Sequence, residues 1–175
     1  MPKIPYAHEG TEAAGATPYY QAIKAKLGIV PNLVKLVGHS GPATEALVTQ
    51  LDVYFSRLTL PVRIREIAYL AAAKTNGCAY CQGHHSPLAQ KAGLSTEQIE
   101  ALADADRAAT VLSSAEAAVV RFSIETTRNV AASEAAHAAL AEHFRPELIA
   151  EIAVVVASAN FIQRIGRNFG VELEG

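Results

Sequence analysis

The sequence contains no tryptophan, and only 6% of its 175 residues are aromatic. So few aromatic side chains argue against a surface on which nucleic-acid bases stack. There is no excess of basic residues either, since 15 Lys and Arg stand against 17 Asp and Glu and give a formal net charge of −2. Without a basic surface, we expect neither nucleic acid nor an anionic membrane among the partners.

Long hydrophobic runs are also missing. The N-terminus, from Met1 to Tyr6, has no apolar segment of signal-peptide length. The longest uncharged apolar run, Ile152 to Ile162, is shorter than the ~20 residues that span a bilayer and continues into Arg164. These absences predict a soluble, cytoplasmic protein.

Cysteine is rare, and the two that occur, Cys78 and Cys81, are three positions apart. In a cytoplasmic protein such a pair is more typical of a catalytic or metal-binding site than of a structural disulfide. Half of the residues are hydrophobic, so the chain can bury a sizeable core without disulfide bonds. A length of 175 residues fits one domain.

What the sequence does contain is a series of segments with helical spacing and helix-terminating residues, and no segment reads as a strand. Residues 1–16 lack periodicity and indicate an extended N-terminal arm, whereas residues 17–175 are predicted to form a single all-α domain. Thr17 is the expected N-cap of the first helix and Gly28 its end. The helices expected after it cover residues 31–37, 42–58, 61–74, 78–92, a short segment after the capping box at 95–98, 114–128, 133–144 and 146–169.

A short pattern, P-x4-E-I-A, occurs at residues 61–68 and again at residues 146–153, each time at the start of a long apolar helix. The repeat is consistent with an internal duplication of a helical hairpin in which only the first copy kept its cysteines. Alanine-rich helices also resemble one another by chance, so both interpretations stay open.

The segment from Asn76 to His85 carries the side chains with chemical potential. On a helix, Cys78, Cys81 and His85 are spaced i, i+3 and i+7 and therefore share one face. Cys78 is expected at the helix N-terminus, where unpaired amide groups favour a thiolate. One turn beyond Cys81, His85 can take or share the proton of that thiol.

Turn geometry adds Glu66 to this group. If the chain reverses at Asn76 and Gly77, Glu66 lies about ten residues before the turn and His85 about nine after it. Each is then roughly 15 Å along its helix, at ~1.5 Å per residue. The carboxylate is therefore expected level with the imidazole, where it can orient the ring or relay a proton.

The spacing Glu66-x11-Cys78-x2-Cys81-x3-His85 resembles the signature of the AhpD-like alkylhydroperoxidase branch of the carboxymuconolactone decarboxylase family. The segment 27–33 is similar to the corresponding stretch of its peroxidase-related members. This resemblance implies an all-α, AhpD-like helical bundle that assembles into a homo-oligomer, a trimer or hexamer. The last helix, 146–169, is apolar on most sides, as expected of a central or interface helix, and agrees with such an assembly.

The resemblance further implies an alkylhydroperoxidase-like antioxidant enzyme with peroxiredoxin activity and no cofactor or metal. In such an enzyme Cys81 attacks a hydroperoxide after His85 takes its proton, and Cys78 resolves the sulfenic acid to a redox-active disulfide. Glu66 completes the proton relay, and a dithiol reductant, either a protein or a lipoyl-type group, reopens the disulfide. Some family members carry a histidine between the cysteines; this sequence has Tyr80 there, which predicts a shorter or different relay.

Tyr80 and His84 are the candidate substrate-binding residues. Tyr80 is expected in the wall of a pocket or in the core. His84 points about 100° away from His85 on the same helix, so it is expected at a pocket rim or on the surface rather than beside the cysteines.

Two other functions stay open. One is a decarboxylase or isomerase acting on a small lactone or acid, since the wider family includes a decarboxylase, although that enzyme lacks the cysteine pair. The other is a non-enzymatic zinc-binding protein, in which Cys78, Cys81 and His85 join a fourth ligand, Glu66 or His84.

Overall fold

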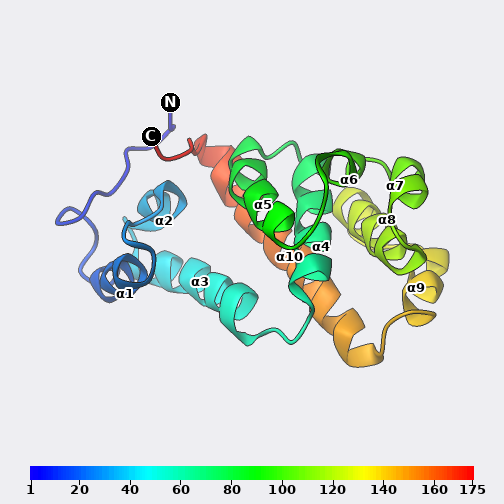
Figure 1. Cartoon of the computed structure of the whole chain (residues 1–175). Helices are drawn as coiled ribbons and strands as arrows, with labels where there is room; N and C mark the ends of the chain where they lie inside the picture. The colour runs from blue at the N-terminus through cyan, green and yellow to red at the C-terminus, as the bar shows by residue number, and fades with distance from the viewer. The chain divides into compact units, whose positions relative to one another are not determined.

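The computed structural model describes residues 1–175, and it is all-α, as predicted, with no strand (Figure 1). Ten α-helices and one π-helical turn, η1, follow one another along the chain. Their bounds are α1 Thr17–Leu27, α2 Asn32–Val37, α3 Gly41–Asp52, η1 Val53–Arg57, α4 Val62–Thr75, α5 Ala79–Lys91, α6 Thr96–Ala101, α7 Ala105–Val111, α8 Ser114–Asn129, α9 Glu134–Ala141 and α10 Pro146–Phe169.

The chain groups into two compact units. One comprises Met1–Arg57 together with Arg164–Gly175, and the other comprises Leu58–Gln163. Helix α10 therefore begins in the second unit and ends in the first. The prediction of an arm over residues 1–16 and a single domain over residues 17–175 stays a prediction, and so does the internal duplication.

In the first unit, residues 1–16 contain no helix and pair with later segments through their backbone. The amide of Ala7 donates to the carbonyl of Lys35, and the Tyr20 hydroxyl on α1 donates to the Ala7 carbonyl at 2.7 Å. Gly38 permits this packing, because a Cβ at that position would lie 1.9 Å from the Tyr20 hydroxyl.

Two helix boundaries differ from the expected ones, and one helix was not expected. Ala16, not Thr17, is the N-cap of α1, because the Thr17 hydroxyl donates to Glu12 at 3.0 Å instead. The helix expected over residues 42–58 is α-helical only to Asp52 and then widens into η1. Helix α7 was not expected at all; its N-cap is Asp104, whose carboxylate accepts hydrogen bonds from the backbone amides of the first turn.

Helix α4 is the central helix of the second unit. All eight residues from Glu66 to Ala73 are buried, and the helix packs against both α5 and α8. A helix that is apolar nearly all round belongs in a core, and the alanines of α4 let its neighbours approach closely. Helix α10 instead buries one side and exposes Val154 and Phe161 on another.

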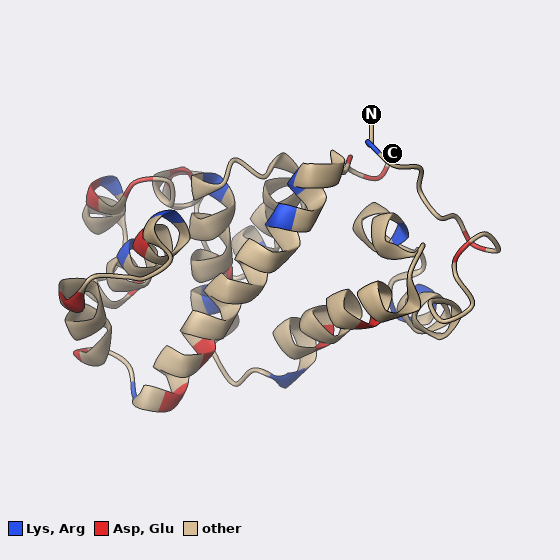
Figure 2. Ribbon diagram, turned by 180° about the vertical axis from the view of Figure 1, so that it is seen from behind, with Lys and Arg blue, Asp and Glu red and all other residues tan.

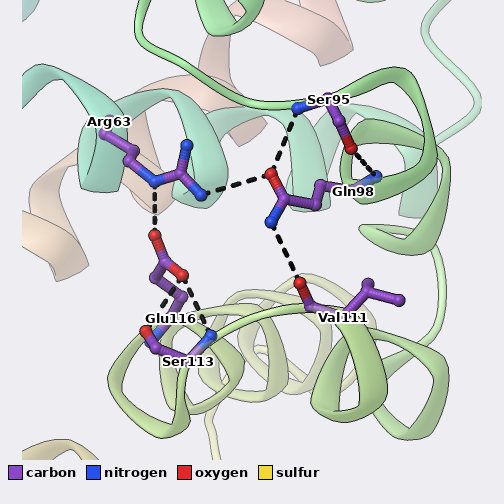
Figure 3. Close-up of polar contacts among 6 residues, drawn as sticks. All are labelled: Arg63, Ser95, Gln98, Val111, Ser113 and Glu116. Carbon is purple, nitrogen blue, oxygen red and sulfur yellow. Dashed lines mark hydrogen bonds and ion pairs between the residues drawn. The ribbon is translucent and has the colours of Figure 1, made fainter.

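A polar cluster holds the start of α4 to the starts of α6 and α8 (Figure 3). Both α6 and α8 begin with a capping box, formed by Ser95 with Gln98 and by Ser113 with Glu116. The guanidinium of Arg63 reaches the second residue of each box, because its Nε donates to Glu116 at 2.5 Å and its Nη2 to Gln98 at 3.3 Å. One side chain of α4 therefore ties together two helix N-termini.

Helix α10 is long and apolar enough to cross a membrane by length and composition, although 39% of its most apolar window is buried. One helix of this kind is weak evidence for a membrane span, because core helices of soluble proteins meet the same criterion. In Figure 2 its acidic residues lie toward the N-terminal end and its basic residues toward the C-terminal end. Glu147 in the first turn and Arg167 in the last turn both complement the helix dipole.

Candidate active site

A tight reversal between α4 and α5 brings the predicted site residues together. The amide of Gly77 donates to the Lys74 carbonyl and that of Cys78 to the Ala73 carbonyl, which is the hydrogen-bond pattern of a Schellman motif. Gly77 has a φ of 63°, a conformation that glycine adopts without strain. The chain therefore turns back at the position that the spacing of Glu66 and His85 requires.

Cys78 and Cys81 lie side by side at the start of α5. Cys78 is the N-cap, and its sulfur accepts a hydrogen bond from the Cys81 amide at 3.4 Å. The two Sγ atoms are 2.7 Å apart, with the Cys78 thiol as donor, and both cysteines are buried and outside any disulfide. A small movement of either side chain would bring the sulfurs to the ~2.05 Å of a disulfide bond.

Glu66 and His85 form a buried pair beside the cysteines. Nδ1 of His85 lies 2.8 Å from Oε2 of Glu66, as the turn geometry predicted, and the carboxylate is fully buried. Arg65 approaches the other carboxylate oxygen, at 3.5 Å, and brings a compensating positive charge. A carboxylate on Nδ1 orients the imidazole and selects the tautomer in which Nε2 carries the lone pair.

Tyr69 belongs to this site and was missed by the sequence analysis. Its ring stacks on the His85 imidazole, with centroids 3.7 Å apart and planes 17° from parallel. Its hydroxyl donates to the sulfur of Cys81 at 3.8 Å. The available signal was its position, because Tyr69 follows Glu66 by three residues and so shares its face of α4.

The environment shifts the pKa values of Cys81 and His85 in opposite directions. The adjoining Cys78 thiol, followed by burial, raises the pKa of Cys81 well above its ordinary range, although the Tyr69 hydroxyl lowers it. Burial lowers the pKa of His85, and the Glu66 carboxylate only partly opposes that effect. His85 is therefore a neutral imidazole at neutral pH, able to accept a proton from a thiol that does not ionise unaided.

The two candidate substrate-binding residues, Tyr80 and His84, contact each other. Tyr80 is buried and His84 is exposed, and their rings meet edge to face at 4.5 Å. Their part in substrate binding stays a prediction.

A second polar feature anchors the turn from α10. The Asn76 amide group donates to Gln163 at 2.6 Å and to Asn160 at 3.0 Å, and Asn160 in turn donates to Thr127 on α8. Asn76 precedes Cys78 by two residues, so this partly buried network fixes the backbone from which the first cysteine projects. Sequence reasoning did not detect it, because it joins residues 84 and 87 positions apart.

The same side chains were also candidates for a zinc site. No group of three or more His, Cys, Asp and Glu side chains is arranged so that it could hold a metal ion. The structure brings Glu66, Cys78, Cys81 and His85 together. Their catalytic roles stay predictions.

The segment that holds these residues matches a known protein family. A model of the carboxymuconolactone decarboxylase family matches residues 43–125, the segment that holds Glu66, both cysteines and His85. This segment of the chain is therefore similar to the carboxymuconolactone decarboxylase family. No curated protein matches the chain.

Solved structures show that the chain has an AhpD-like fold. An AhpD-core, peroxidase-related protein from Ralstonia eutropha JMP134 superposes with a TM-score of 0.81 at 19% identity, covering 99% of this chain and 92% of that one. A peroxidase-related protein from Silicibacter sp. TM1040 has a TM-score of 0.79 at 22% identity and coverages of 99% and 94%. The debrominase Bmp8, in complex with 2,3,4-tribromopyrrole, has a TM-score of 0.74 at 18% identity and coverages of 93% and 87%. Family and fold together indicate an enzyme of the AhpD or carboxymuconolactone decarboxylase type.

Proposed function

We propose that the protein is a thiol-dependent peroxidase that reduces organic hydroperoxides through Cys78 and Cys81. The observation that carries this proposal is the contact of the two sulfurs, 2.7 Å apart, in one buried cluster with the Glu66–His85 pair. A dithiol beside a general base is what a two-electron reduction by thiols requires.

In the first step His85 accepts the proton of Cys81, and the resulting thiolate attacks the terminal oxygen of the hydroperoxide. The O–O bond breaks, Cys81 becomes a sulfenic acid, and the alcohol leaves with the proton that His85 returns. The lowered pKa of His85 supports this role, because a neutral imidazole can accept the proton at neutral pH. Glu66 accepts the Nδ1 hydrogen and stabilises the imidazolium that forms.

In the second step the sulfur of Cys78 attacks that of the Cys81 sulfenic acid. The S–S bond forms, the S–O bond breaks, and water leaves with the Cys78 proton. The overall reaction consumes one hydroperoxide and two thiols and yields one alcohol, one water and one disulfide. A dithiol reductant, a protein or a lipoyl-type group, then returns two electrons and two protons.

We further propose that the enzyme acts in the cytoplasm as a homo-oligomer, a trimer or hexamer. The exposed side chains of Val154 and Phe161 on α10 support association, because apolar groups at the surface are buried when subunits meet. Light scattering of the purified protein measures the subunit number directly, and a monomer at all concentrations would contradict the proposal.

The test of the main proposal is a free-thiol titration before and after one equivalent of cumene hydroperoxide, with intact mass in parallel. We expect two thiols and two hydrogen atoms to be lost per chain, and a dithiol to restore both. A titration with all thiols retained while the hydroperoxide persists would refute the peroxidase.

The same titration separates the other functions. Decarboxylation of a lactone or acid changes no thiol and is insensitive to alkylation of the cysteines. Zinc binding would appear as stoichiometric metal in the untreated protein, with thiols that resist the titrant. A debromination that takes its two electrons from the cysteines would also oxidise two thiols per bromide released. For this reason 2,3,4-tribromopyrrole, the ligand bound to the debrominase Bmp8, is tested beside the hydroperoxide.

A further inference from the structure

Tyr69 connects the Glu66–His85 pair with the cysteine pair. It is buried on α4, three residues after Glu66, and it touches both the imidazole and the second sulfur. Centroid to centroid, its ring is 3.7 Å from that of His85; its hydroxyl is 3.8 Å from Cys81 Sγ. The peroxidase mechanism above assigns it no task.

The ring contact restricts how His85 can move. The Glu66 carboxylate holds the imidazole at its Nδ1 edge, and the nearly parallel Tyr69 ring covers one of its faces. An edge contact alone leaves the ring free to swing about the hydrogen bond. An edge and a face contact together keep it in one plane, which is the condition for repeated proton transfer at a set position.

The hydroxyl contact concerns the charge on sulfur. Cys81 is buried, so water is not there to stabilise its thiolate, and the neighbouring Cys78 sulfur disfavours a negative charge. A phenol hydroxyl donates a hydrogen bond to an anionic sulfur more strongly than to a neutral thiol. The contact is therefore worth most when Cys81 is ionised, as thiolate before the reaction and as sulfenate after it.

We propose that Tyr69 is a further functional residue of this site, whose hydroxyl stabilises the anionic forms of the Cys81 sulfur and whose ring positions His85. The proposal rests on the thiol chemistry inferred above. It names two separable roles, because Tyr69→Phe removes the hydroxyl and keeps the ring, whereas Tyr69→Leu removes both. The other titratable or charged groups around the sulfur, which are Glu66, Arg65 and His85, are left in place by both substitutions of Tyr69, and residue 78 is the same in each pair of proteins compared.

The first test measures the hydroxyl role on Cys81 alone. In a Cys78→Ser background, which keeps an N-cap side chain and leaves one thiol, the rate of alkylation by iodoacetamide is followed by intact mass over a pH series. Adding Tyr69→Phe is expected to raise the pH of half-maximal reactivity by about one unit. At pH values below that midpoint, alkylation should therefore be about tenfold slower. Tyr20→Phe is the matched control, since it also removes a buried, hydrogen-bonded tyrosine hydroxyl but in the first unit.

The second test measures the ring role on His85. A stacked aromatic ring shifts the NMR signal of the imidazole Hε1 upfield, so wild type and Tyr69→Phe are expected to share this shift and Tyr69→Leu to lose it. Identical alkylation profiles with and without the Tyr69 hydroxyl would overturn the first role. An imidazole signal with no upfield shift in the wild type would overturn the second, whether or not Tyr69→Leu folds.

Neither readout uses a hydroperoxide, so the failure of one proposal is distinct from that of the other. Hydroperoxide reduction with an alkylation profile that ignores Tyr69→Phe would overturn this inference and leave the peroxidase intact. A shifted profile in a protein that leaves hydroperoxide untouched would support the Tyr69 contact and refute the peroxidase.

Discussion

The Nδ1 atom of His85 is 2.8 Å from Oε2 of Glu66, and both side chains are withdrawn from solvent on helices joined by the Gly77 turn. In this setting the carboxylate has the imidazole as its hydrogen-bond partner in place of water. Removing either group is therefore expected to impair the proton relay.

His85→Gln is expected to lower the rate of hydroperoxide reduction about a hundredfold, because the general base is lost. Glu66→Gln is expected to lower it less, since the imidazole remains but loses its orienting charge. Initial rates with cumene hydroperoxide measure both effects, and His143→Gln, at an exposed position, is the control. A rate unchanged in Glu66→Gln would reduce that residue to a structural role.

The His85 pKa predicts how stability depends on pH. Burial lowers this pKa below its ordinary value of 6.5, so the unfolded chain takes up a proton before the folded protein does. His85 therefore has no effect on the free energy of unfolding above pH 6.5. As the pH falls from 6.5 toward the folded-state pKa, protonation of the unfolded chain progressively lowers that free energy. Urea denaturation over this range should show a weaker pH dependence in His85→Gln. Equal dependence in both proteins would mean that the pKa of His85 is the same in the folded and unfolded states.

The two cysteines are expected to fail in different ways. Cys81→Ser removes the attacking sulfur and should reduce hydroperoxide consumption to the background rate. Cys78→Ser leaves the attack possible but removes the resolving thiol, so one equivalent of hydroperoxide should yield a sulfenic acid on Cys81. Dimedone labelling with intact mass detects that product, and full turnover by Cys81→Ser would show that another group attacks.

The Arg63–Glu116 ion pair is expected to support stability at neutral pH. Burial acts to raise the pKa of Glu116, but hydrogen bonds from Arg63 and Ser113 lower it overall below 4.5. The stabilisation is then present above pH 4.5 and lost as the pH falls through the folded-state pKa.

Arg63→Met is the variant that tests this pair, because it keeps most of the side-chain volume and removes the donors. We expect a loss of about 1–3 kcal/mol in the free energy of unfolding at pH 7, shrinking in acid. Arg107→Met, at an exposed ion pair with Glu100, is the control and should change little. A loss of equal size at pH 7 and in acid would exclude the ion pair as its source.

Val130, after the end of α8, has a φ of 70°, which is strained for a β-branched residue. Its side chain is 89% exposed, so little packing is lost when it is removed. Val130→Gly is expected to raise the free energy of unfolding by about 1 kcal/mol, measured by chemical denaturation. Val130→Ala keeps the Cβ and should gain less, and an equal gain in both variants would locate the effect elsewhere.

The sequence alone determined the features that depend on neighbours along the chain. Helix ends at Gly28 and at the Ser95–Gln98 capping box follow from the conformations and hydrogen bonds available to those residues. The facing of Glu66 and His85 was also predictable, because a tight turn transmits helical register over a short distance. Helix α7 was missed because its start signal, Asp104, was not recognised.

Only the tertiary structure decided which helix is central and which side chains surround the sulfurs. Helix α10 has the more apolar sequence of the two, yet α4 has the continuous buried stretch. Burial depends on what packs against a helix and not on its composition alone. Tyr69 meets Cys81 and His85 only because α4 turns that face toward α5. Asn76 meets Gln163 across 87 positions, and contacts over such separations are set by packing that no local pattern records.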